Sequence, residues 1–111
     1  MRINSNMVYF VYIMTNKHNT VLYVGVTNDI EARTFVHKTK LNNGFTAKYN
    51  CNKLVYFEEY QDILVAIHRE KQLKKYRRAW KEDLVYQMNP DWKDLSEGWY
   101  DPREFDSFVR P

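Results

Sequence analysis

Two short apolar runs joined by a polar turn constrain the fold of this chain most strongly. Residues 8–14 (VYFVYIM) and 21–26 (VLYVGV) are rich in β-branched and aromatic side chains, which are typical of β-strands. The polar residues 16–19 between them predict a hairpin turn. Both faces of the first run are apolar, which indicates a strand at the centre of its sheet.

The hairpin predicts that two tyrosines lie together. If the turn is centred between Lys17 and His18, Tyr12 and Tyr23 face each other across the two strands. Side chains that are opposed in an antiparallel pair are neighbours on one face of the sheet. We therefore expect two phenol groups side by side.

The remainder of the chain predicts one more strand and three helices. Asp29 and Asp62 are suitable N-cap residues, and Asn89-Pro90 ends the last helix. The elements expected are a helix over about 29–40, a strand over 53–60, and helices over about 63–76 and 79–88.

Composition favours one globular domain without a membrane span. The chain has 111 residues, of which 44% are hydrophobic and 28% charged. It has no apolar run of about 18 residues and no signal-peptide core near its first residue. The single cysteine, Cys51, can form no internal disulfide, so we expect a reducing, cytoplasmic environment.

Charge is distributed unevenly along the chain. Residues 1–81 contain 14 Lys and Arg against 6 Asp and Glu, whereas residues 82–111 contain 3 against 8. Residues 69–81 alone carry seven basic side chains and one acidic one. A basic body with an acidic tail favours an anionic partner such as nucleic acid, the alternative being an ordinary solvated mixture of charges.

Three further polar residues are candidates for a site. Arg33 and His37 are four residues apart and share one face of the helix predicted there. Glu70 lies in the middle of an apolar helix face, where an unpaired carboxylate is costly, so we expect it to have a partner. Taken singly, these residues and the two tyrosines also fit structural roles in packing, solvation and ion pairing.

Considered together, these positions resemble the GIY-YIG nuclease family. The tripeptides at 10–12 (FVY) and 23–25 (YVG) resemble the two that name the family, although a phenylalanine replaces the first glycine. Arg33, eight residues after the second glycine position, and Glu70, a further 37 on, match the catalytic arginine and the metal-binding glutamate. His37 matches a histidine of several branches. The segments VYFVYIM, TNDIEAR and HREKQLK are similar to those of small stand-alone bacterial members, related to the nuclease subunit of nucleotide excision repair.

The resemblance implies a fold and a division of the chain. The family has an α+β fold, with a three-stranded antiparallel sheet flanked by helices, and this agrees with the predicted elements. We expect a single domain over residues 1–111, with a nuclease-like core at 8–95 and an acidic, aromatic tail at 96–111. Gly25 is expected to have a structural role in the site, the alternative being that it simply allows tight packing of helix and sheet.

The resemblance also implies a function, that of a DNA endonuclease that hydrolyses phosphodiester bonds in DNA repair or in the processing of branched DNA. One divalent ion, Mg²⁺ or Mn²⁺, would be bound by Glu70, since Mg²⁺ needs only one or two carboxylates. Arg33 would hold phosphate oxygens. Tyr12, Tyr23 and His37 can position or deprotonate the attacking water, and the sequence does not separate their roles.

The expected partner is DNA, recognised by its structure rather than its sequence, because the chain has no room for a separate recognition domain. We expect a monomer. Residues 42–52 predict a polar surface loop. A non-catalytic nucleic-acid-binding module of the same fold is the main alternative, and a protein-binding adaptor that uses the aromatic tail is a weaker one. Backbone phosphate contacts are expected from Lys48, Lys74, Lys75, Arg77 and Arg78.

Overall fold

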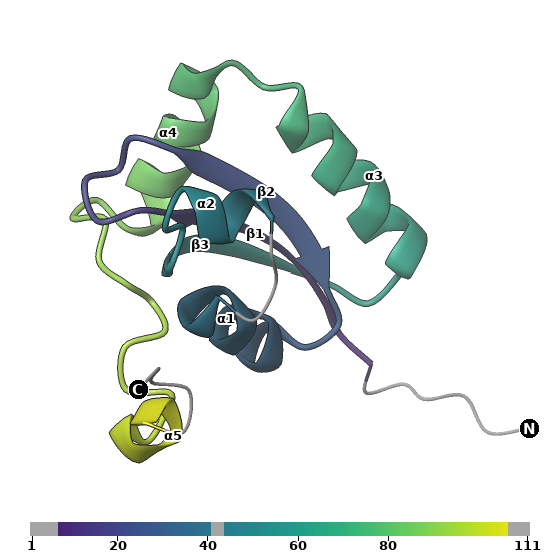
Figure 1. Ribbon diagram of the computed structural model, residues 1–111. Helices are drawn as coiled ribbons and strands as arrows, with labels where there is room; N and C mark the ends of the chain where they lie inside the picture. The colour runs from purple at the N-terminus through teal and green to yellow at the C-terminus, as the bar shows by residue number, and fades with distance from the viewer. Residues whose placement is uncertain (1–6, 41–43, 107–111) are drawn as a thin grey trace, which may run out of the picture.

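The computed structural model describes residues 7–40 and 44–106. It contains the three strands and the three long helices that the sequence predicts, together with two short helices (Figure 1). In chain order the elements are β1 (Tyr9–Thr15), β2 (Leu22–Thr27), α1 (Ile30–Thr39), α2 (Phe45–Lys48), β3 (Lys53–Tyr60), α3 (Ile63–Lys74), α4 (Arg78–Met88) and α5 (Pro102–Asp106).

The three strands form an antiparallel sheet in the order β2-β1-β3, so β1 is central as predicted. Helices α3 and α4 lie on one face of this sheet and α1 lies on the other (Figure 1). Because side chains alternate along a strand, Val11 and Ile13 point into the core under α3, whereas Tyr12 and Met14 point to the α1 side. The α+β fold with a flanked three-stranded sheet is therefore confirmed.

The register of the hairpin differs from the prediction. Tyr12 pairs with Gly25, and Met14 is the residue opposite Tyr23. A shift of two residues keeps every side chain on its own face, because the period of a strand is two. The two phenols are therefore diagonal neighbours, with ring centroids 6.3 Å apart. The expectation of adjacent phenols is correct, but the expectation of directly opposed ones is wrong.

A longer turn accounts for the shift. The connection runs over residues 16–21 and is closed by Asn16, whose side-chain oxygen accepts a hydrogen bond from the backbone N–H of Thr20 at 2.8 Å. Asn19 has a φ of 58°, in the left-handed region that asparagine tolerates. A side-chain-closed loop of this kind displaces the centre of the hairpin from the position that a tight turn would give.

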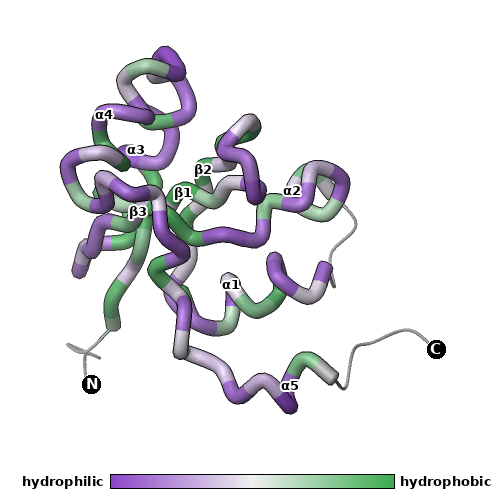
Figure 2. The backbone as a smooth tube through the Cα atoms, turned by 90° about the vertical axis from the view of Figure 1, so that its left-hand side faces the viewer, coloured by the Kyte–Doolittle hydropathy of each residue, from purple (hydrophilic) through white to green (hydrophobic). Residues whose placement is uncertain are grey.

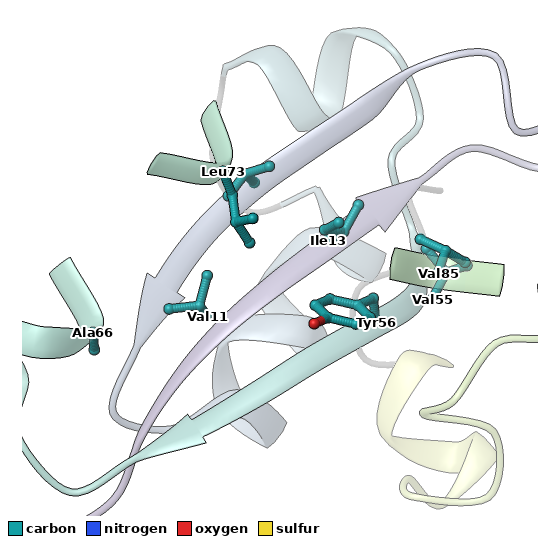
Figure 3. Packing of buried hydrophobic residues seen from close by; sticks show 8 residues of the cluster. Val11, Ile13, Val55, Tyr56, Ala66, Leu73 and Val85 are labelled. Carbon is teal, nitrogen blue, oxygen red and sulfur yellow. The ribbon is translucent and has the colours of Figure 1, made fainter. Parts of the chain in front are cut away.

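The core between the sheet and α3 and α4 consists of apolar side chains. Leu73 and Ala66 of α3 and Val85 of α4 are fully buried (Figure 3). The strands are the most hydrophobic part of the chain, and the helices alternate between polar and apolar residues (Figure 2). The other members of this core are Val11, Ile13, Val24, Val55 and Tyr56.

An ionic network fastens α3 to β3. Arg69 donates to both carboxylate oxygens of Glu58, at 2.9 Å each, and Tyr56 and Tyr60 donate their hydroxyl groups to the same carboxylate. Burial alone would raise the pKa of the Glu58 carboxyl, but these hydrogen bonds hold the pKa below its usual value. Glu58 is thus an ionised group with all of its acceptor capacity in use.

The segment after α4 crosses to the α1 side of the sheet. The backbone N–H of Leu95 donates to the carbonyl of Leu54 at 2.7 Å, and Asp94 forms an ion pair with Lys38 of α1. Helix α5 lies beside α1, and the ring of Phe105 stacks on that of Phe35 at 5.2 Å (Figure 2). Within the described part of the chain, no helix is long and apolar enough to cross a membrane.

Candidate active site

The candidate site is centred on Tyr12 of the central strand β1, which pairs with Gly25 of β2. The ring of Tyr12 is 1% exposed and lies across Gly25. A Cβ atom at Gly25 would come within 2.4 Å of the Tyr12 hydroxyl oxygen, which is far closer than non-bonded atoms approach. The Tyr12 ring therefore requires a glycine at position 25.

Tyr12 is hydrogen-bonded to a buried histidine of α1. The Tyr12 hydroxyl lies 2.9 Å from Nε2 of His37, and Nδ1 of the same ring lies 3.0 Å from the hydroxyl of Thr46 in α2. The helix that carries His37 is capped by Asp29, whose side chain accepts from the N–H of Ala32 at 3.0 Å. Tyr12, His37 and Thr46 thus form a continuous hydrogen-bonded row on the α1 face.

Both titratable members of this row are neutral at pH 7. Burial lowers the pKa of His37 to about 4, and the positive charge of Arg33 lowers it further in the same direction. Burial raises the pKa of Tyr12 well above its usual value, and nearby Tyr23 adds to that effect. A neutral imidazole donates from one nitrogen and accepts at the other, so when Tyr12 donates to Nε2, Nδ1–H donates to Thr46.

Arg33 supplies a positive charge at the exposed side of the Tyr12 and His37 pair. Its side chain is exposed, yet it lies close enough to Tyr12 and His37 for its charge to act on the pKa of each. Tyr23 completes the cluster, with its ring centroid 5.6 Å from that of His37. The structure therefore brings together four of the five residues predicted for the catalytic site.

The fifth residue, Glu70, approaches from the other face of the sheet. Its negative charge raises the pKa of Tyr12, but by less than burial and Tyr23 do. The Glu70 side chain is 13% exposed and forms an ion pair with Lys74 at 2.8 Å. The expected partner is thus a lysine one helical turn away. Among the described residues, Glu70 makes no hydrogen bond or ion pair with the other four.

The donor set suits a single divalent ion with few protein ligands. The described residues contain no group of three or more His, Cys, Asp or Glu side chains placed to hold a metal. Lys74 occupies Oε2 of Glu70, and no described residue donates to Oε1. Mg²⁺ commonly binds through one or two carboxylates, several waters and substrate phosphates. Glu70 fits that mode of binding.

A groove of about 290 Å³ follows the open edge of β2. It links the α1 face, through Tyr23, to Lys74, the residue paired with Glu70. Of the five candidate catalytic residues, Tyr23 alone lines this groove, and Glu70 is connected to it through its ion pair with Lys74. Its lining residues are Leu22, Tyr23, Val24, Phe45, Lys74 and Lys81.

Two of the residues predicted to contact DNA are already engaged. Arg78 donates to the backbone carbonyls of Asn19 and Thr20 at 2.6 and 2.9 Å, which anchors the start of α4 to the hairpin. The guanidinium of Arg77 lies over the ring of Trp80 at 5.4 Å.

The other three predicted contacts, Lys48, Lys74 and Lys75, have exposed side chains, and Lys74 borders the groove. Lys81 also borders it, although no sequence pattern separates this lysine from its basic neighbours.

The sequence also missed Thr46 and Phe45. Residues 42–52 were predicted to be a polar surface loop, but α2 lies there, and Thr46 and Cys51 are buried. Lys48 and Tyr49 are exposed, as expected. The contact between Thr46 and His37 depends on how the chain returns across the sheet, and no local pattern encodes it.

Comparison with known proteins identifies one family and a group of small relatives. A family model described as the GIY-YIG catalytic domain matches residues 8–83. A UPF0213 protein of Clostridium perfringens is 40% identical over 80 residues, covering 68% of this chain and 81% of the relative. A UPF0213 protein of Haloquadratum walsbyi is 35% identical over 84 residues, covering 72% and 89%.

A solved structure supports the fold. The solution NMR structure of a UPF0213 protein from Bacillus halodurans aligns with a TM-score of 0.51 at 24% identity, covering 83% of this chain and 98% of that one. The family match spans both strands of the hairpin, α1 and α3, and therefore the whole candidate site. This chain belongs to the GIY-YIG family of nuclease-type catalytic domains.

Proposed function

We propose that this protein is a divalent-metal-dependent endonuclease that hydrolyses phosphodiester bonds in DNA. The observation that supports it best is the hydrogen-bonded row of Tyr12, His37 and Thr46 with the charge of Arg33 beside it. A packing role alone would not require a buried, neutral histidine bonded at both ring nitrogens. Membership of the family indicates the class of reaction. The hydrogen-bonded row offers a path for the proton of the attacking water.

Arg33 binds the phosphate in this proposal. A guanidinium holds phosphate oxygens through two parallel hydrogen bonds and keeps its charge at every relevant pH. Because Arg33 lies beside the Tyr12 hydroxyl, a phosphate bound there is next to the row. Tyr23, at the border of the groove, faces the same phosphate.

Tyr12 and His37 act as one unit on the attacking water. The raised pKa of Tyr12 makes a free phenolate rare at pH 7, so the tyrosine needs an acceptor for its own proton. The water proton passes to the Tyr12 oxygen while the Tyr12 proton passes to Nε2 of His37. His37 alone is a weak base with a pKa of about 4, and the negative charge of the phosphate bound at Arg33 makes its protonation more favourable. The water oxygen then bonds to phosphorus as the bond to the leaving oxygen breaks; the leaving oxygen takes a proton from solvent, and His37 returns its proton to solvent. Thr46 holds the imidazole in the required orientation.

Glu70 would bind the divalent ion, Mg²⁺ or Mn²⁺. Such an ion stabilises the charge that develops on the phosphate and on the leaving oxygen. Similarity to the nuclease subunit of nucleotide excision repair suggests a role in DNA repair or in the processing of branched DNA. The alternative, a non-catalytic DNA-binding module, would need the basic groove but not Glu70.

Cleavage of a panel of end-labelled DNAs tests the proposal. Single-stranded, duplex, nicked and branched DNAs would be incubated with Mg²⁺, Mn²⁺ or EDTA. We expect Glu70→Gln to keep the fold and DNA affinity but to lose cleavage by several orders of magnitude, because the charge stabilisation at the phosphate is lost.

Glu82→Gln is the matched control, since Glu82 forms the equivalent ion pair with Arg78 one turn along α4. Its cleavage rate should be unchanged. Cleavage by folded Glu70→Gln at the wild-type rate would contradict the metal-binding role. Wild-type protein that binds DNA but cuts no member of the panel would favour the binding module.

A further inference from the structure

Three aromatic rings lead outward from the candidate active site: Tyr23 and Phe45 line the groove, and Tyr49 lies next to Phe45. The ring of Phe45 stacks on Tyr23, with centroids 6.1 Å apart and planes at 29°. The ring of Tyr49 follows at 4.7 Å from Phe45. Phe45 is 48% exposed and Tyr49 is 39% exposed. We call Tyr23, Phe45 and Tyr49 the aromatic row.

The position of this row is tied to the catalytic cluster. Helix α2 has only four residues, and its buried member, Thr46, is hydrogen-bonded to His37. Phe45 immediately precedes Thr46, and Tyr49 directly follows α2. Their rings are consequently held at a defined place beside the histidine, although half of the Phe45 side chain stays in water, where an apolar ring is costly.

Cations border the same rings. Nζ of Lys48 lies 5.3 Å from the centre of the Tyr49 ring. Lys74 and Lys81 line the groove together with Phe45 and Tyr23. Lys74 is shared with Glu70, whereas no described side chain forms an ion pair with Lys48 or Lys81. Exposed aromatic rings within a positively charged groove are the combination that binds single-stranded nucleic acid, because bases stack on the rings while cations meet the phosphates.

We propose that the aromatic row binds the bases of unpaired nucleotides that flank the phosphate held at Arg33, so that the ligand of this groove is single-stranded DNA. In a duplex each base is already covered by its neighbours, and stacking on Phe45 would first require unstacking. The identity of the phosphate rests on the proposed function, but stacking on Phe45 and Tyr49 does not.

Another exposed ring provides a comparison. Tyr86 of α4 is 64% exposed, more than either ring of α2, yet it does not line the groove. If exposure alone allowed stacking, Tyr86 would serve as well as Phe45. Tyr86→Leu is therefore a matched control for Phe45→Leu.

The test measures binding in EDTA, where cleavage is stopped. The probes are a twelve-nucleotide oligothymidylate with one 2-aminopurine, whose fluorescence is quenched when it stacks, and the same strand annealed to its complement. We expect the full chain to bind and quench the single strand and to bind the duplex more weakly. Phe45→Leu should lose about fivefold to about a hundredfold in single-strand affinity, together with the quenching. Phe45→Trp should retain both, and Tyr86→Leu should match wild type.

Circular dichroism of each variant verifies that it is folded. The proposal is overturned if folded Phe45→Leu binds and quenches like wild type, if the duplex binds as tightly as the single strand, or if neither probe binds. Cleavage with Mg²⁺ distinguishes the two proposals. Phe45-dependent stacking without cleavage keeps this inference and removes the endonuclease, whereas cleavage that is indifferent to Phe45 and to strandedness does the reverse.

Discussion

The two faces of the sheet are built from alternate residues of the same strand and differ in what they bury. Toward α3 and α4, β1 presents Val11 and Ile13 to an apolar core. Toward α1, it presents Tyr12, whose hydroxyl is hydrogen-bonded to buried His37. The α1 face also has an apolar cluster that includes Met14 and Leu54, but within it lies a buried hydrogen-bonded row whose polar atoms need specific partners. A single strand thus supplies both the main core and the candidate site.

Two consecutive residues of α3 show the same division. Arg69 points to β3 and completes the fully hydrogen-bonded Glu58 network. Among the residues that the structure describes, Glu70 has one ion-pair partner, Lys74, which lies beside the groove at the β2 edge. A carboxylate with all of its acceptors occupied serves structure, whereas one that keeps an oxygen available can bind a ligand.

The largest expected effect on stability comes from the apolar face. Leu73→Ala removes a fully buried side chain and leaves a cavity, so the free energy of unfolding should fall by about 2–5 kcal/mol. Urea denaturation measures the loss, and cleavage per folded molecule should stay at the wild-type value. A large fall in that specific activity would mean that the two faces are not separable.

A pH-dependent effect should come from the polar face. His37 has a pKa of about 4 in the folded chain and about 6.5 in the unfolded one, so between these values the unfolded state binds more protons. The free energy of unfolding is therefore highest, as far as His37 is concerned, above pH 6.5. It falls by up to about 3 kcal/mol as the pH falls toward 4.

Urea denaturation at pH 4, 5, 6 and 7 measures this dependence. In His37→Gln the part of the slope due to this group should disappear, while the slope due to the carboxylates remains. Parallel curves for the variant and the wild type would contradict the burial of a neutral His37.

A smaller loss of stability is expected at the boundary between the strands. In Gly25→Ala the new methyl group meets the hydroxyl end of the Tyr12 ring, and the displaced ring breaks its bond to His37. We expect a loss of about 1–3 kcal/mol, as for other overpacked cores, with a disproportionate loss of cleavage. Gly44→Ala is the control, because a Cβ atom there meets nothing within 4 Å. Equal behaviour of the two variants would contradict the contact.

The sequence predicted what local patterns encode. Runs of β-branched and aromatic residues located the strands, Asp62 capped α3 as expected, and helical spacing placed Arg33 and His37 on one face of α1. The hairpin register was missed, because Asn16 closes a longer loop by a side-chain hydrogen bond that composition does not distinguish from a tight turn.

The predicted site residues were found by spacing, but their partners depend on long-range packing. Thr46 reaches His37 from a segment that reads as a polar loop, and Lys74, rather than a residue of the tyrosine cluster, pairs with Glu70. The reason for Gly25 is likewise visible only when the Tyr12 ring is placed across it. Which residues of two elements meet depends on how the helices and strands pack together, and the local sequence of either element does not reveal it.

The cleavage rate of Tyr12→Phe tests the central claim most directly. The variant keeps the ring over Gly25 and removes only the hydroxyl that joins the site to His37. In a single-turnover assay with Mg²⁺ and excess protein, we expect the rate to fall by about 10²–10⁴, the contribution of a positioned proton-transfer group. The fold and DNA affinity should be retained. A folded Tyr12→Phe protein that cuts at the wild-type rate would contradict the assignment of this face as the active site.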